Sequence, residues 1–246
     1  MPCERVNLQR ASQILDVAEH HIENYGLLSF NVSSVIAESN QSTTTFYKRF
    51  KGKEDLLVCL FLRNATSNHF AAIEAQYPNM TLIERFLLPI VLSFEMAHKY
   101  PAFLLVRQVS VNSRVWKMAD ERKVRLFKQK IDNFWRYINQ GIRDLVSNGD
   151  LVASDEEILY LTQSVTFFLS GCLNALECGL IDTQFIDEER TKVFNQLTHL
   201  FKGYQWNSEV SYSAFEKMGM RCYMYLNQLE QQQQDKCLYC LQHATG

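Results

Sequence analysis

The spacing of the apolar residues is the feature of this chain that most restricts its fold. From residue 8 almost to the end, apolar side chains recur every three or four positions, and strand-like alternation never lasts more than a few positions. Only nine glycines and four prolines interrupt the pattern along 246 residues. Hydrophobic residues make up 47% of the chain, enough for one large core or two small ones. We therefore predict an all-α protein.

Charge and cysteine content narrow the classes of protein further. The formal net charge is -2 and the pI about 6.3, so any surface for a polyanion must be a local patch. Seven cysteines at irregular spacings, behind an N-terminus without an apolar signal core, favour reduced thiols in the cytoplasm. The longest apolar runs contain polar residues or proline and fall short of a clean membrane span. We expect a soluble protein without disulfides and without a membrane partner.

Three helices are predicted near the N-terminus. The first runs from about Asn7 to Tyr25 and stops at Gly26, the residue that best adopts a left-handed C-terminal cap. Asn31 can cap the short helix VSSVIAES, and Asn40 offers a second left-handed position. Ser42 can cap the next short helix, TTTFYKRF. Two short helices joined by a tight turn behind a longer one are typical of a helix-turn-helix, whose last helix enters the major groove of DNA.

The composition of that last helix fits such a role. Thr43, Thr44 and Thr45 supply hydroxyls for hydrogen bonds and methyls that can touch thymine, and the helix N-terminus favours phosphate. Phe46 and Phe50 would anchor this poorly helical segment to the core. The alternative is an ordinary helical corner.

Residues 40–53 contain no carboxylate, so their cations form a local basic patch. The patch holds Lys48, Arg49, Lys51 and Lys53, and Tyr47 can donate its hydroxyl to a phosphate. Because screening acts over about 8 to 10 Å, distant acidic residues do not cancel it. The plain alternative is that these cations merely face solvent.

The rest of the chain is also predicted to be helical. Thr81 with Glu84, and Ser154 with Glu157, have the spacing of capping boxes that start helices. Further helices are predicted from Lys53 to before Pro78, through TLIERFLLPIVLSFEMAHKY with a kink or interruption at Pro89, after Pro101, from about Ser113 to Ser147, and after Asp182. The segment after Trp206 keeps helical periodicity but carries a glutamine run. We predict three regions: 1–52 for DNA binding, 53–206 for effector binding and dimerisation, and 207–246 as a C-terminal helical extension.

A set of residues within roughly residues 8 to 60 resembles, without gaps, the TetR family of bacterial transcriptional regulators. These residues are Arg10, Ile14, Leu15, Ala18, Gly26, Asn40, Gln41, Ser42, Phe46, Tyr47, Phe50, Lys53, Glu54, Leu56 and Leu57. The resemblance implies a homodimer whose larger domains pair through a four-helix interface and bind a small effector that usually releases DNA.

The resemblance also implies roles for single residues. Asn31 and Ser33 fall where the family contacts the DNA backbone, and Tyr47 and Lys53 fall on its phosphate contacts. Groove-facing positions are occupied by Thr43, Thr44, Thr45 and Lys48, with Ser42 at the start of their helix. Two departures stand out: Thr44 lies where members often carry glycine, and Ile36 lies where they usually carry a small residue. The operator sequence therefore cannot be transferred.

An effector pocket of the usual apolar kind would be lined by aromatic residues, although each of them, taken singly, fits plain core better. Glu95 and Arg107 lie inside apolar stretches, where each could orient an effector of opposite charge. The alternative for each is a partly exposed side chain or an ion pair between helices. The candidate pocket residues are Phe86, Phe94, Glu95, Phe103, Arg107, Trp116, Phe127, Trp135 and Phe168.

Motifs for metal binding and catalysis are weak or missing in this sequence. Cys237 and Cys240 with His243 could bind zinc or change redox state, but the only nearby fourth ligand is Cys222, and cysteines three apart on a helix more often simply pack. No Ser-His-Asp, HExxH, phosphate-loop or GxGxxG pattern occurs. We expect no metal, no cofactor and no enzymatic activity.

The sequence thus predicts a TetR-like DNA-binding transcriptional regulator, a repressor, that binds a pseudo-palindromic operator as a homodimer and is released by a small, mostly apolar effector. The alternative is a helical protein-interaction module that has lost DNA binding.

Overall fold

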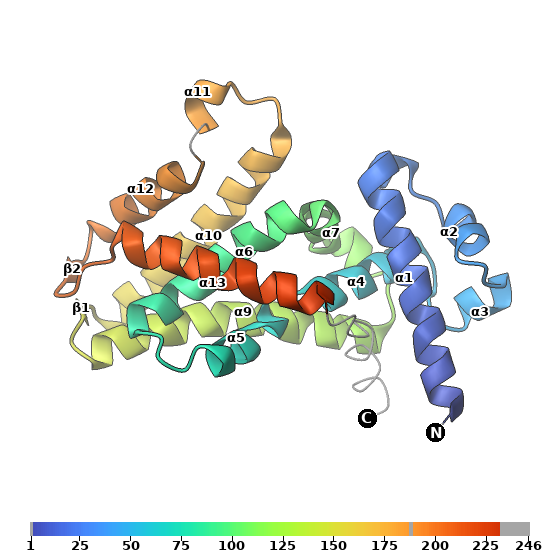
Figure 1. Ribbon diagram of the computed structural model, residues 1–246, viewed down its shortest axis with the longest axis horizontal. Coiled ribbons are helices and arrows are strands. Elements are labelled where there is room, and N and C mark those ends of the chain that lie inside the picture. Colours follow the sequence, from blue (N-terminus) through green and yellow to red (C-terminus); the bar gives the residue numbers. More distant parts are fainter. Residues whose placement is uncertain (1, 187–188, 232–246) are drawn as a thin grey trace. The chain divides into compact units, whose positions relative to one another are not determined.

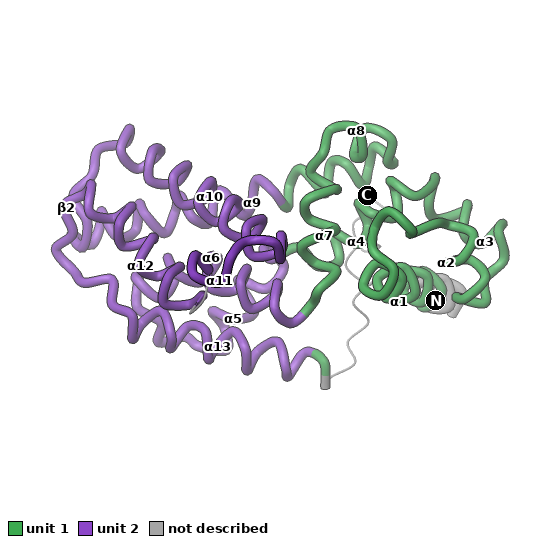
Figure 2. Tube along the Cα trace, turned by 90° about the horizontal axis from the view of Figure 1, so that it is seen from above, with its two compact units in different colours: residues 1–65, 100–130, 230–246 green, residues 66–99, 131–229 purple. Residues whose placement is uncertain are grey.

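The computed structural model describes residues 2–186 and 189–231. In these residues the all-α class is confirmed, with one short antiparallel ribbon of β1 (Leu151–Val152) and β2 (Gln205–Trp206). That ribbon was not predicted, because two-residue strands are too short to show alternation. The chain divides into two compact units, coloured in Figure 2.

The first unit contains the described residues of 1–65, 100–130 and 230–246. Its helices are α1 (Pro2–Ser29), α2 (Val32–Glu38), α3 (Thr43–Tyr47), α4 (Lys53–Asn64), α7 (Pro101–Ser110), α8 (Ser113–Trp116) and the start of α9 (Glu121–Ser147). One apolar core joins them, with Ile14, Val35, Phe46 and Leu60 fully buried. Figure 1 shows α2 and α3 beside α1. The predicted region boundaries at residues 52 and 206 do not coincide with the boundaries of these units. The roles assigned to the predicted regions stay a prediction.

The predicted N-terminal caps of the two short helices, Asn31 and Ser42, are confirmed. The Asn31 side chain accepts a hydrogen bond from the Ser34 amide at 2.9 Å, and the Ser42 hydroxyl accepts one from the Thr45 amide at 3.1 Å. Asn40 has φ 53° and Gly26 has φ 72°, both in the left-handed region. Helical structure resumes after Gly26 and reaches Ser29, so Gly26 breaks α1 rather than ending it.

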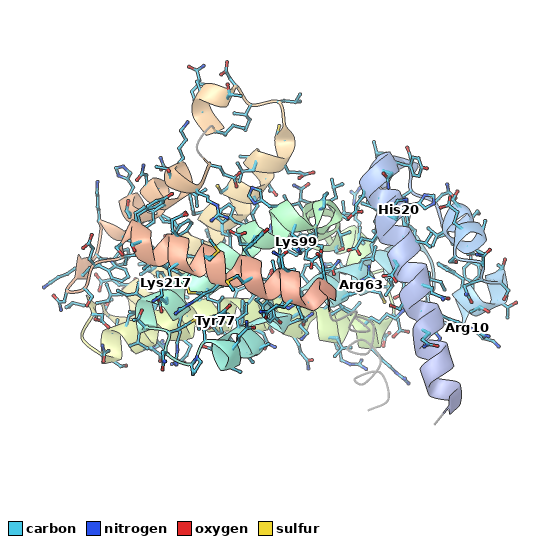
Figure 3. The ribbon with its side chains drawn as sticks, viewed as in Figure 1. Arg10, His20, Arg63, Tyr77, Lys99 and Lys217 are labelled. Atoms are coloured by element: carbon cyan, nitrogen blue, oxygen red, sulfur yellow. The ribbon has the colours of Figure 1, made fainter. Side chains whose placement is uncertain are left out.

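The single helix predicted from Lys53 to before Pro78 was wrong. It ends at Asn64, where Ala65 turns extended, and is followed by η1 (Thr66–Asn68) and α5 (Phe70–Gln76). The sequence Thr66–Asn68 consists of side chains that compete with the helical backbone for hydrogen bonds. The preceding Arg63, labelled in Figure 3, is buried. It pairs with Asp16, at 2.5 Å, and with Glu19 of α1.

The long helix predicted over residues 113–147 is also interrupted. The four residues after α8 form a turn before α9, and the Asp120 amide donates to the Asp55 carboxylate at 2.9 Å. The Asp120 carboxylate in turn accepts from the Arg122 amide, which helps to start α9. A tertiary contact therefore decides where this helix begins.

The second unit contains residues 66–99 and 131–229. Its helices are η1, α5, α6 (Leu82–Lys99), the rest of α9, α10 (Asp155–Cys178), α11 (Thr183–Ile186), α12 (Glu189–Phe201) and α13 (Tyr212–Gln231). Both predicted capping boxes are present, at Thr81 with Glu84 and at Ser154 with Glu157. Helix α6 runs through Pro89 without interruption, contrary to one of the two expectations for this residue.

Helix α13, the described part of the predicted C-terminal extension, is held by a buried carboxylate. Glu84 of α6 is 3% exposed and accepts from Lys217 at 2.5 Å and from Arg221 at 2.9 Å, both on α13. Burial raises the pKa of Glu84, but these two cations and the Thr81 amide outweigh it and lower the pKa. Figure 3 labels Lys217 on this helix. The extension is thus an integral helix of the second unit as far as residue 229.

One helix of the described residues, α10, is long and apolar enough to cross a membrane by length and composition alone. Its inner face belongs to the core of the second unit, where Leu161, Val165 and Leu169 are buried. Its outer face also carries large apolar side chains, so the helix is apolar on two sides. A core helix with a second apolar face passes the same test as a membrane span.

Candidate nucleic-acid interface

Helix α3 is anchored from behind by two aromatic side chains. Phe46 is fully buried and Phe50 is 3% exposed, and their ring centroids lie 5.2 Å apart. The helix has only five residues, so its own hydrogen bonds would not hold it folded in isolation. The anchors therefore fix a segment of low helix propensity, as the sequence predicted.

The outer face of α3 presents the residues that the sequence assigns to DNA. Thr43, Thr44 and Lys48 are exposed, and Tyr47 is 57% exposed. Thr45 is half-buried, and its hydroxyl lies 2.8 Å from the Ser42 hydroxyl. Ser42 and Thr45 thus use their oxygens within the cap, whereas the other residues face solvent.

The two candidate residues near the start of α2 behave differently. Ser33 is exposed in the first turn of the helix. Asn31 is exposed as well, but its side-chain oxygen is used to cap α2. Its amide group therefore keeps the donors that a phosphate contact would need.

Lys53 has a second role that the sequence did not indicate. Its ammonium donates to the carbonyl oxygens of Phe30, at 2.7 Å, and Leu27, at 3.2 Å, and lies 5.3 Å from the centroid of the Phe30 ring. It thereby ties the start of α4 to the end of α1. An ammonium has three N–H donors, so one remains for the predicted phosphate contact.

Two residues missed by the sequence analysis, Asp55 and Lys123, lie just behind the basic patch. Asp55 is 1% exposed, and its carboxylate accepts from the Lys51 amide at 2.9 Å, the Asp120 amide at 2.9 Å and the Lys123 ammonium at 2.6 Å. Lys123 also donates to the Arg49 carbonyl at 2.6 Å. In the sequence, Asp55 looks like any acidic residue that favours a helix N-terminus, so no signal marked its burial.

The charges around this cluster stabilise one another. Burial lowers the pKa of Lys123, but the neighbouring Cys59 and Asp55 outweigh it and raise the pKa. Burial likewise raises the pKa of Asp120, yet the Arg122 amide and the Lys51 ammonium, 3.2 Å away, lower it overall. Lys123 and Asp120 are therefore ionised at neutral pH.

The candidate effector residues divide between the two units. In the first unit, Phe103 and Phe127 are buried, and Phe127 packs its ring 4.6 Å from that of Phe61. Trp116 and Arg107 are half-buried, and burial lowers the pKa of Arg107. These residues belong to the same unit as the candidate DNA surface.

In the second unit, Phe86 is core: its ring lies 5.6 Å from that of Phe201 and 6.2 Å from that of Trp206. Trp135 and Phe168 are half-buried, and Trp135 packs its ring 5.9 Å from that of Phe167. The ring contacts of Phe86 and Trp135 are those of packed core residues, which was the alternative to a role in effector binding.

Phe94 and Glu95 line a small cavity in the second unit. The cavity measures about 10 Å³ and is also lined by Val91, His98, Glu189, Arg190, Val193 and Phe215. Glu95 is buried and paired with Arg190 of α12, a partner that the sequence could not show. Burial raises the pKa of Glu95, although Arg190 and His98 oppose the shift. Glu95 therefore forms an ion pair between helices α6 and α12, one of the alternatives predicted for it.

The candidate metal ligands Cys237, Cys240 and His243 lie outside the described residues. Cys222, the fourth ligand considered, is buried in α13, and burial raises the pKa of its thiol. Its protonated side chain packs in the second unit as a small apolar group.

Comparison with known proteins identifies the fold. Neither the protein-family models nor the curated proteins contain a match to this chain. Among solved structures, it is similar to a bacterial regulatory protein in the tetR family from Rhodococcus RHA1, with a TM-score of 0.57. The chain has the TetR-family fold. That match has 13% sequence identity and covers 81% of this chain and 98% of the Rhodococcus protein.

A second TetR-like structure extends the comparison. It is the transcriptional regulator FadR from Bacillus subtilis in complex with stearoyl-CoA, with a TM-score of 0.57 and 16% identity. The match covers 78% of this chain and 98% of FadR. The resemblance found in residues 8 to 60 therefore extends, as a fold, over most of the chain.

Proposed function

We propose that this protein is a DNA-binding transcriptional regulator, a repressor without enzymatic activity, that acts in the cytoplasm. The observation that carries the proposal is the outer face of α3. Thr43, Thr44, Tyr47 and Lys48 face solvent there, while Phe46 and Phe50 hold the helix rigidly from behind. A rigid, exposed, carboxylate-free helix is what major-groove recognition requires.

The second part of the proposal is a homodimer that places two copies of α3 on one pseudo-palindromic operator. Its support is the outer face of α10, where Leu159 is 50%, Tyr160 51% and Phe167 64% exposed. Exposed apolar side chains aligned on one helix favour burial against another chain. A C2 dimer would bury each such face against its copy.

The third part is release by a small, mostly apolar effector bound in the second unit. The cavity beside Glu95 has apolar walls of Val91, Phe94, Val193 and Phe215. At about 10 Å³ it has room for about one water molecule, so an effector must open it. Such an effector would stabilise the opened arrangement and release DNA by its differential affinity for the two states.

DNA selection tests this function directly. The purified protein would be used to enrich duplexes from a random-sequence pool, and the enriched sequence would be compared with a scrambled duplex in mobility-shift titrations. We expect a pseudo-palindromic consensus bound at least about a thousandfold more tightly than the scrambled duplex. Thr44→Ala should cost about 1 to 3 kcal/mol at a few base positions and leave binding to scrambled DNA unchanged.

The same experiment decides the alternative, a helical interaction module that has lost DNA binding. In that case selection would enrich no sequence, and binding to all duplexes would be equally weak. Thr44 favours the regulator, because an exposed threonine on the outer face of α3 is poorly suited to helix formation but well suited to base contacts.

A further inference from the structure

Lys123 joins the end of the candidate recognition helix to the start of α9. The chain leaves α3 through Lys48, and the carbonyl of Arg49, in the turn that follows, accepts from the Lys123 ammonium at 2.6 Å. The same ammonium lies 4.8 Å from the centroid of the Phe50 ring, which anchors α3. A single side chain from α9 therefore touches both the backbone and the aromatic anchor that place the recognition helix.

Asp55 completes this connection from the other side. Its carboxylate is 1% exposed and binds the Lys123 ammonium, the Lys51 amide and the Asp120 amide together. Lys51 belongs to the turn after α3, and Asp120 immediately precedes α9. A second tie joins the same two segments, since the Lys51 ammonium lies 3.2 Å from the Asp120 carboxylate. A buried carboxylate with its charge and lone pairs satisfied in this way holds its partners in one geometry.

We propose that Lys123 and Asp55 are positioning residues for DNA recognition: they lock the turn after α3 to the start of α9 and so fix the angle at which α3 meets the groove. The inference rests on the proposed DNA-binding function and deepens it. The Lys123 side chain is only 22% exposed, because it packs against the turn after α3. It therefore acts through α3 and needs no phosphate contact.

These contacts of Lys123 and Asp55, called the lock below, also give α9 a means of controlling DNA binding. Residues 121–130 of α9 belong to the first unit, and the same continuous helix enters the second unit at residue 131. A change in the second unit that moves or frays the start of α9 would withdraw Lys123 from Arg49 and Asp55. The recognition helix would then lose its fixed position while keeping its own side chains.

The experiment compares Lys123→Met with the matched control Lys128→Met, an exposed lysine on the same helix. The probe is the duplex enriched by selection with the unaltered protein, beside a scrambled duplex. For Lys123→Met we expect affinity for the enriched duplex to fall about tenfold or more, because a buried charge pair is broken. Affinity for the scrambled duplex and the salt dependence should stay unchanged, since the phosphate contacts remain. Lys128→Met should behave like the unaltered protein.

Hydrogen exchange supplies a readout that does not depend on DNA. In Lys123→Met, the amides of residues 46–52 should exchange faster, while those of α2 should keep their protection. Asp55→Asn should weaken binding to the enriched duplex in the same way, and its effect should not add to that of Lys123→Met, because both break one cluster. Should Lys123→Met fail to fold, Lys123→Gln replaces it: its amide can still donate to the Arg49 carbonyl but carries no charge for Asp55.

Two results would overturn the inference. One is a Lys123→Met protein with unaltered affinity for the enriched duplex and unaltered exchange at residues 46–52. The other is an equal loss on both duplexes with a shallower salt dependence, which would make Lys123 a phosphate contact. If selection enriches no duplex at all, the proposed function fails instead, and exchange at residues 46–52 still decides whether the lock exists.

Discussion

At the scale of single residues, two lysines of the basic patch have different roles: Lys53 contributes to the stability of the fold as well as to DNA binding, and Lys48 to DNA binding alone. The Lys53 ammonium is bonded to the carbonyl oxygens of Leu27 and Phe30, whereas Lys48 is exposed at the end of α3. As a groove-facing cation, Lys48 should affect sequence recognition: Lys48→Ala should cost about 1 to 3 kcal/mol at a few base positions of the enriched duplex, with no loss of stability.

Lys53→Ala should lower stability as well as DNA affinity. We expect a loss of about 1 to 3 kcal/mol in urea unfolding, because the two carbonyl oxygens lose a charged donor. The measurement pairs urea unfolding with DNA titration across about 50 to 200 mM salt for both variants. Equal stability of the two variants would contradict the structural role of Lys53.

His98 predicts a dependence of stability on pH. Its ring nitrogens lie 2.8 Å from the Phe94 carbonyl oxygen and 3.1 Å from the Glu189 carboxylate, so both act as donors when the ring is protonated. The hydrogen bond to Glu189 raises the pKa of His98 from 6.5 to about 9, although burial opposes it. Because the folded-state pKa is raised, the stabilisation is fully present below pH 6.5 and is lost as the pH rises through about 9.

The test compares the melting temperatures of the unaltered protein and His98→Gln. The difference between them should be largest at about pH 6 and should shrink by about pH 10. The effect is small because the His98 side chain is 54% exposed. A difference that stays constant over this range would rule out the charged pair as its cause.

At the scale of elements, α13 depends on Glu84 of α6. This buried carboxylate caps α6 through Thr81 and accepts from Lys217 and Arg221 of α13. Glu84→Ala should therefore cost about 3 to 5 kcal/mol of stability, since it leaves the partly buried Arg221 without this partner. Urea unfolding would measure the loss, and limited proteolysis would show whether α13 is released.

A matched control for Glu84 is Asp155, which pairs with Arg143 at 2.7 Å but is 85% exposed. Asp155→Ala should cost only about 0 to 1 kcal/mol, because water screens an exposed pair. Similar losses for the two variants would mean that burial of Glu84 does not set its importance.

At the scale of the whole molecule, the proposed dimer depends on the outer face of α10. Phe167→Glu places a charge at a side chain that is 64% exposed in a single chain but would be buried between two. We expect a monomer in sedimentation experiments. Affinity for a two-half-site duplex should fall about 100-fold or more, because the second α3 is no longer tethered, whereas affinity for a half-site should change little.

Met220→Glu is the control for this prediction, since Met220 of α13 has a similar exposure of 60%. It should leave the sedimentation behaviour unchanged. If Met220→Glu abolishes the dimer and Phe167→Glu does not, the interface lies on α13 instead.

Local physical chemistry explains how much could be predicted. The helical period, the caps at Asn31, Ser42 and Ser154, and the left-handed Asn40 all depend on residues within about four positions of one another, so the sequence contains them. The start of α9 was missed because it is set by the hydrogen bond from the Asp120 amide to Asp55, 65 positions earlier in the chain. Helix boundaries set by such contacts have no local signal.

By itself, then, the sequence determined the helical class and a short threonine-rich helix anchored by Phe46 and Phe50, since periodicity and capping act over single turns. Tertiary structure alone decided which charges are buried and paired. Asp55 with Lys123, Glu84 with Arg221, and Glu95 with Arg190 bring together side chains 68, 137 and 95 positions apart. The free energy of a buried charge depends on the partner that folding places beside it, and spacing along a chain does not encode that partner.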